Sequence, residues 1–115
     1  MSNQSIPVLV LTVKAAAALT RYRAVTAGGT HAATAIYGVA ASDAAIGSLA
    51  AVNVVGTTPL EAGAAIPAGT AFLIADANGR AIAGGTAAEC LARLCPGQFA
   101  TGAGDVVEGL LSLGV

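Results

Sequence analysis

Short apolar segments separated by glycine and proline are the feature that most limits the folds open to this chain. The clearest case is AIPAGTAFLIADANGRAIA, residues 65–83, in which two apolar runs flank Asn78-Gly79. Asn-Gly in this setting is the strongest short-range hairpin signal, because a type I′ turn needs positive φ at both central residues. We therefore predict a hairpin whose first strand ends at Ala75 and whose second strand covers 80–83.

Similar apolar, partly β-branched runs recur along the chain and end at turn residues. Fifteen glycines and four prolines provide those turns, and Pro59, Gly63 and residues 66–69 indicate a loop. Besides the hairpin arms, the predicted strands cover residues 6–13, 21–29, 35–42, 49–56 and 105–115. About seven short strands at this spacing predict a mainly β fold, a small antiparallel β-barrel or sandwich.

Residues 86–95, TAAECLARLC, fit two structures equally well. Thr86 and Glu89 have capping-box spacing, Glu89 and Arg93 stand four residues apart, and Pro-Gly follows, all of which favour one short helix. An edge strand is the alternative. Residues 15–20 are similarly open between a short helix and an extended link.

The polar residues 1–5 are predicted to form a flexible N-terminal arm, which leaves 6–115 as a single β-rich domain. Only 10% of the residues are charged, against about 25% in average soluble domains. The strand at 6–13 is apolar on both alternating faces, which indicates burial on both. In so small a protein we expect one face to meet a neighbouring subunit. The expected interface residues are Ile6, Val8, Leu9, Val10 and Leu11.

Charge and hydropathy argue against two classes of partner. The formal net charge is -1 and the few basic residues are scattered, which disfavours nucleic-acid binding. Lys14 interrupts the longest apolar stretch, well short of the about 20 residues that span a membrane. The start MSNQS lacks the basic region of a signal peptide, so synthesis in the cytoplasm is the expectation.

The acidic residues favour structural roles over catalysis. Asp43, Asp76 and Asp105 lie in Gly/Ala-rich turns, where aspartate hydrogen-bonds its own backbone. Glu61 and Glu108 are predicted to be solvated. General acid–base catalysis needs two positioned ionisable groups, and the sequence indicates none.

The remaining reactive side chains are few. His31 has no serine, cysteine or aspartate partner nearby and is predicted to be a surface residue. Cys90 and Cys95 are too few to hold zinc, and we expect two small buried hydrophobes. The sequence therefore predicts no enzyme, no metal and no cofactor.

Several motifs follow one another in a definite order. They are YRAVTAGG at 22–29, GVAASDAAIG at 38–47, EAGAAIPAG at 61–69, DANGRA at 76–81 and GAGDVVEGLL at 102–111. In this order and spacing the chain, over residues 6–111, resembles the phage head decoration proteins, also called capsid cement proteins. The segment AECLARLCPGQF, residues 88–99, departs from that pattern.

This resemblance implies a β-rich structural virion protein, made in the host cytoplasm and located on the outer surface of a tailed-phage head. It implies a homotrimer that stabilises the shell, with the major capsid protein and other copies of itself as partners. Many weak contacts repeated over a lattice give high avidity. Two alternatives stay open: a small sugar-binding-like β-module, suggested by EAGAAIPAG, and a tail or fibre component.

Overall fold

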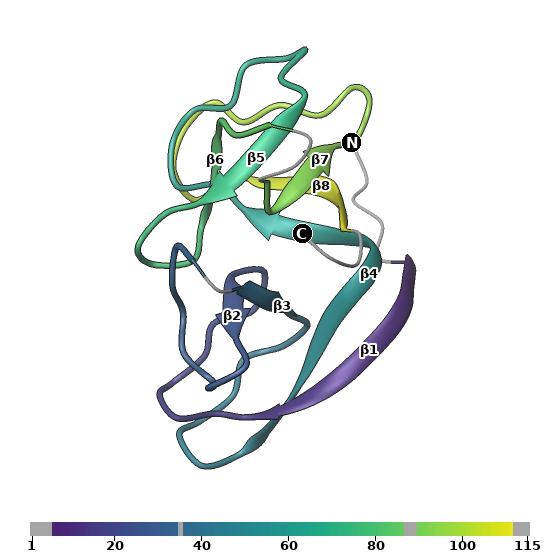
Figure 1. Ribbon diagram of the computed structural model, residues 1–115. Helices are drawn as coiled ribbons and strands as arrows, with labels where there is room; N and C mark the ends of the chain where they lie inside the picture. Colours follow the sequence, from purple (N-terminus) through teal and green to yellow (C-terminus); the bar gives the residue numbers. More distant parts are fainter. Residues whose placement is uncertain (1–5, 35, 87–89, 112–115) are drawn as a thin grey trace.

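The computed structural model describes residues 6–34, 36–86 and 90–111, and in these the protein is all β (Figure 1). Eight antiparallel strands form one barrel-like sheet, which confirms the predicted fold class with one strand more than the approximate count. The strands are β1 Ile6–Lys14, β2 Ala24–Thr26, β3 Ile36–Ala40, β4 Leu49–Glu61, β5 Phe72–Ala75, β6 Ala81–Ala83, β7 Ala92–Leu94 and β8 Val106–Leu111.

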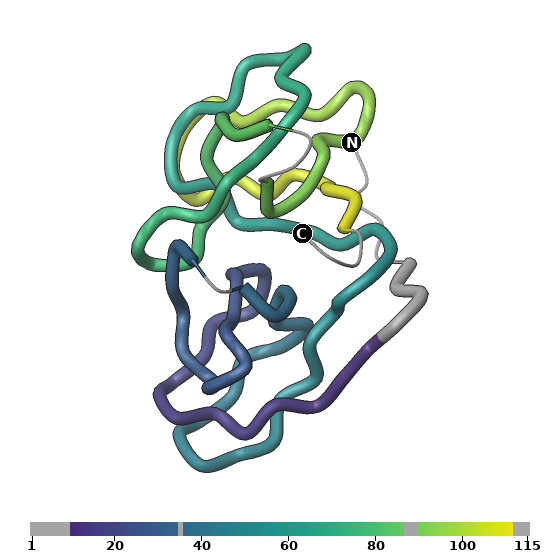
Figure 2. Tube along the Cα trace, in the orientation of Figure 1, coloured from purple at the N-terminus to yellow at the C-terminus, as the bar shows by residue number. Residues whose placement is uncertain are grey.

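Strand β4 is the central strand of the sheet and pairs with three others. The strand order is β2-β3-β4-β8-β7-β5-β6, and β1 pairs with β4 in addition. The first half of β4 pairs with β1 and β3, and its second half pairs with β8. A parallel bridge between Ala62 and Ala81 brings β6 back to the end of β4. It closes the upper half of the molecule, which comprises β5 to β8 and the second half of β4 (Figure 2). The lower half comprises β1 to β3 and the first half of β4.

β4 runs through Pro59, where the sequence indicated a loop. Pro59 stands opposite Glu108 of β8, whereas the register of β1 along β4 ends at Thr57. Because β4 is paired on one side only at this point among the described residues, a residue without a backbone N–H is tolerated there. The predicted strand 49–56 is therefore extended to Glu61.

The core has two parts, which β2 and β3 separate. The larger part lies within the closed upper half and includes Leu60, Ile66 and Leu73, and the smaller part lies between β1, β2 and β4. Successive residues of a strand point to opposite faces. Ala24 accordingly packs in the larger core and Val25 in the smaller one, so that the two halves share these strands.

The predicted hairpin is confirmed, but its turn is of another type. Asn78 has a negative φ, and only Gly79, at +80°, is left-handed. The Asp76 carboxylate accepts hydrogen bonds from the N–H groups of Asn78 and Arg80, and Gly79 N–H donates to the Asp76 carbonyl at 2.9 Å. The side chain of Asp76 therefore favours a three-residue loop ending in a left-handed glycine over the type I′ turn.

Residues 92–94 form strand β7 between β5 and β8, so the strand interpretation of residues 86–95 is correct for this part. Glu89, on which the helix prediction rested, lies outside the described residues. Residues 15–20 form an extended link, with Leu19 bridged to Ala44. The predicted arm, residues 1–5, also lies outside the described part.

Candidate interaction surfaces

The hairpin turn is docked on the segment that leads into β2. Ala24 N–H donates to the Gly79 carbonyl at 2.7 Å, and Glu61 N–H donates to the Tyr22 carbonyl at 2.9 Å. A Cβ on Gly79 would lie 2.7 Å from the Ala24 carbonyl oxygen. The turn of the upper half is therefore in close backbone contact with the lower half.

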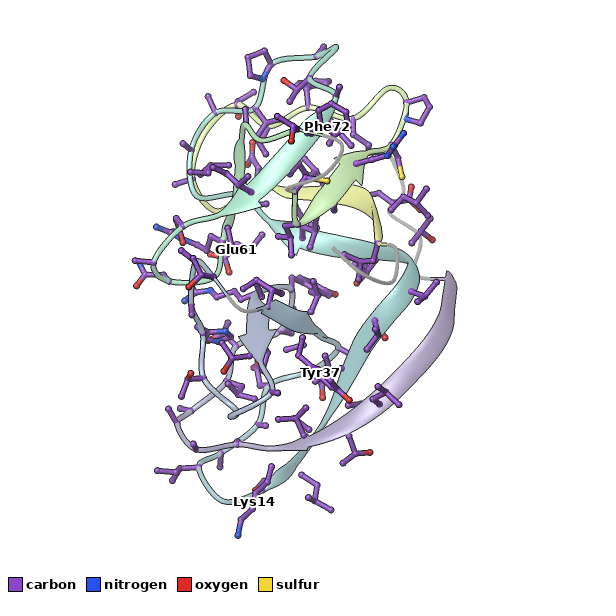
Figure 3. All side chains as sticks on the ribbon, in the orientation of Figure 1. Lys14, Tyr37, Glu61 and Phe72 are labelled. Carbon is purple, nitrogen blue, oxygen red and sulfur yellow. The ribbon has the colours of Figure 1, made fainter. Side chains whose placement is uncertain are left out.

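Glu61 lies at this junction, at the end of β4 (Figure 3). Arg23 Nε and Nη2 donate to the two oxygens of Glu61 at 3.1 and 3.2 Å. Arg80 Nη1 lies 3.7 Å from Glu61 Oε2, and Arg80 Nε lies 3.7 Å from Asp76 Oδ2. Glu61 is thus paired and mostly buried, and the expectation of a solvated side chain was wrong because its partners come from distant segments.

The three aspartates behave differently from one another. Asp76 and Asp105 bind nearby backbone as predicted: Asp105 Oδ2 accepts Thr101 N–H at 2.8 Å and the Thr101 hydroxyl at 2.7 Å. Hydrogen bonds from the side chain and then the backbone of Thr101 lower the pKa of Asp105. Asp43 instead accepts the N–H of Arg21, remote in sequence, at 2.8 Å.

His31 is a structural residue and not merely a surface residue. Thr20 N–H donates to its Nε2 at 2.9 Å, and its Nδ1 lies 2.8 Å from the Ala24 carbonyl. This assigns the proton to Nδ1, because a carbonyl accepts only from an N–H. The ring therefore joins the two ends of the segment 20–24, and both of its nitrogens are used.

Neither cysteine is in a disulfide, and both are half-buried. Burial, and secondly the charge of Glu108, raise the pKa of the Cys95 thiol. Across residues 6–34, 36–86 and 90–111, no three of His, Cys, Asp or Glu gather as a metal site would require. In the same residues there is no helix of the length and apolarity needed to cross a bilayer.

The predicted interface strand, β1, is paired on one side only in the described part of the chain. Val10, Thr12 and Lys14 are exposed, whereas Val13 packs in the smaller core. Within the described sheet, β1 pairs with β4 alone, and register shifts on either side of Leu9 interrupt it. The side chains of Ile6, Val8 and Leu9 are not among those that the structure describes. Of the five predicted interface residues, the structure therefore describes the side chains of Val10, which is 46% exposed, and of the half-buried Leu11.

Other apolar side chains lie on the outer surface of the sheet. Opposed residues of neighbouring strands share a face, and the register sets Thr57, Leu110, Arg93 and Phe72 in one row across β4, β8, β7 and β5. Leu110 is 45% exposed. Ile46, in the turn before β4, and Leu49, the first residue of β4, are 70% and 73% exposed. These positions are exposed apolar groups on the outer surface, and the sequence pattern singled out none of them.

Sequence reasoning also missed a feature at Tyr22. Its φ is +67°, and no other described non-glycine residue has a positive value. The Arg21 guanidinium lies over its ring, with Cζ 5.0 Å from the centroid. Neither residue type signals a left-handed conformation, which results from the contacts around it.

The fold and these surfaces define a class of protein: a small all-β module that exposes several large apolar side chains, among them Ile46, Leu49 and Leu110. The family of phage cement proteins matches residues 3–109. The chain belongs to this family, and it is a structural protein of the phage virion.

Among solved structures, the chain is similar to "The crystal structure of head fiber gp8.5 N base in bacteriophage phi29". The TM-score is 0.71 and the identity 23%, over 90% of this chain and 93% of that one. At this identity the likeness shows the shared fold. No curated protein matches the chain significantly.

Proposed function

We propose that this protein binds the outer surface of a tailed-phage head and stabilises the shell against the pressure of packaged DNA. The observation that carries this proposal is family membership over nearly the whole chain. The role is mechanical, without catalysis or cofactor. The major capsid protein is the partner, and the protein reaches the head from the host cytoplasm.

The internal contacts support such a role. The ion pairs of Glu61 and the docked hairpin turn join two hydrophobic cores, and β4 runs through both halves. A cement must resist deformation when the shell is loaded. Closely packed protein interiors have low compressibility and transmit strain, which suits a clamp between capsid subunits.

We further propose that the protein acts as a homotrimer that associates through the outer face of β1. Val10 is an exposed apolar residue on a strand with one described sheet partner. Pro7 and the register shifts in β1 disfavour extension of the sheet along its free edge. Association through the face of the strand is therefore favoured over strand addition.

A second candidate is the base of a fibre attached to the head. The shared fold with a head-fibre base, over nine-tenths of each chain, favours it. A base would carry a rod that is visible by electron microscopy. A cement protein would cover the shell at regular positions.

The test is to separate heads from tails of the phage that encodes this protein and to quantify the 11.0 kDa chain against the major capsid protein. A copy number comparable to that of the shell protein, in the head fraction, is expected. Rods that project from the heads at the positions of this protein would favour the fibre base, and absence from heads would contradict both. Heads prepared without the protein should burst at lower osmotic shock and regain resistance when it is added back.

A further inference from the structure

Tyr22 has a backbone conformation that favours glycine. At φ +67° it is the one described non-glycine residue in the left-handed region, which costs about 1–2 kcal/mol for a residue with a side chain. A glycine would adopt it without that cost. Strained residues persist where the surroundings hold them and are common at binding sites. A tyrosine here calls for a role that its side chain fills.

The core does not supply that role. Tyr22 is partly buried and belongs to neither hydrophobic core. Its hydroxyl makes no hydrogen bond with any described residue. Buried tyrosine hydroxyls usually have a partner, so this ring is placed as a surface group.

The backbone around Tyr22 is held at nearly every residue by distant segments. The N–H of Thr20 is bound by His31, and that of Arg21 by Asp43. Tyr22 N–H donates to the Ala40 carbonyl at 2.9 Å, while the Tyr22 carbonyl accepts from Glu61. The backbone of residues 20–22 is therefore held in place and presents the side chains of Arg21 and Tyr22. Little backbone conformational freedom is lost when a partner binds.

Arg21 completes the site. Its guanidinium lies 5.0 Å from the Tyr22 ring centroid, its side chain is exposed, and it forms no ion pair with the described residues. Arg23, by contrast, is committed to Glu61 at 3.1 Å. A planar guanidinium backed by a ring presents its N–H groups outward for two-point binding of a carboxylate. Arginine and tyrosine are also the residue types that dominate binding hot spots.

We propose that Arg21 and Tyr22 form a recognition site for a carboxylate-bearing segment of the capsid shell. The inference rests on the proposed function and adds to it the point of contact and its chemistry. The site lies on the link between β1 and β2, whereas self-association is assigned to the outer face of β1 itself. One surface is thereby left for other copies and another for the shell.

The experiment measures binding of the full chain to heads prepared without it, for wild type, Arg21→Gln and Tyr22→Gly. Glycine accepts the left-handed conformation, so Tyr22→Gly removes the ring and keeps the backbone path. We expect each variant to lose about tenfold or more in affinity, with the oligomeric state of wild type and a melting temperature no lower than that of wild type. Arg21→Lys should recover little, because it restores charge without the planar group.

The matched control is Arg93→Gln. Arg93 lies over Phe72 at 5.5 Å in a second stack of the same kind, on a strand without backbone strain, and this variant should bind like wild type. Wild type that does not bind heads would overturn the proposed function. Wild type that binds, with Arg21→Gln and Tyr22→Gly binding equally well, would overturn this inference alone. Loss of self-association in these variants would place the site between copies and likewise contradict it.

Discussion

Arg23 donates hydrogen bonds to both carboxylate oxygens of Glu61, at 3.1 and 3.2 Å, although the two residues are 38 positions apart in the sequence. The side chains of the two residues are 25% and 18% exposed. Two-point arginine–carboxylate pairs are stronger and better oriented than single contacts. The pair fixes the start of β2 to the end of β4, next to the docked hairpin turn.

Glu61→Ala should lower the free energy of unfolding by about 1–3 kcal/mol, because it leaves the half-buried Arg23 without its acid and Arg80 with Asp76 alone. Urea denaturation measures the loss. Glu108→Ala is the control, since that half-buried carboxylate has no ion pair in the described residues, and it should cost far less. Equal losses in the two variants would show that the network adds nothing.

Gly79→Ala should destabilise more than Gly69→Ala. Both glycines have positive φ, +80° and +89°, so each alanine carries backbone strain of about 1 kcal/mol. A Cβ at position 79 would also meet the Ala24 carbonyl at 2.7 Å, whereas position 69 has nothing within 4 Å. Thermal or urea unfolding should therefore show about 2–4 kcal/mol for Gly79→Ala and about 1 kcal/mol for Gly69→Ala. A difference near zero would argue against the close contact.

Val10→Asp should separate the homotrimer into folded monomers. The side chain is exposed in the single chain, so the charge is tolerated there, but it opposes burial between copies. Sedimentation measures the oligomer and circular dichroism the fold. Ile46→Asp, at a more exposed apolar position, is the control and should leave the oligomer intact. A Val10→Asp trimer would contradict the assignment of β1.

The turn at 101–105 should weaken in acid. Hydrogen bonds from Thr101 lower the pKa of Asp105 in the folded state, so the stability that this carboxylate contributes is complete above its unfolded pKa, about 3.9. It is lost as pH falls through the lower folded pKa. Asp105→Asn should therefore be less stable than wild type at pH 7, with the difference shrinking below pH about 3.9. A pH-independent difference between the two would rule out this linkage.

Cys95 should react slowly with alkylating reagents. The raised pKa of its thiol, due to burial and then to Glu108, lowers the thiolate fraction at neutral pH, and the thiolate is the nucleophile. In a Cys90→Ser background, the alkylation rate of Cys95 should increase at a higher pH than the rate of a free thiol does. Glu108→Gln should raise the alkylation rate at pH 8.

Cys90→Ser and Cys95→Ser should each bind heads like wild type.

The strands and the hairpin could be predicted from the sequence because their signals are local. Alternating apolar residues and turn residues act within a few positions, and β1, β5, β6 and β8 lie where the pattern placed them. β7 stayed ambiguous because a short apolar run fits a helix or a strand. Its pairing with β5 and β8 is what the tertiary structure decided.

The sequence by itself determined a β-rich chain of short strands, few charges and the order of motifs that marks its family. Only the tertiary structure decided which polar groups meet. Glu61 reaches Arg23, His31 reaches Thr20, and the docked turn holds Gly79 against Ala24. The left-handed Tyr22 belongs to the same group. The physical reason is that hydrogen bonds and ion pairs need atoms within about 3–4 Å, and sequence periodicity carries no information on which distant segments the fold brings that close.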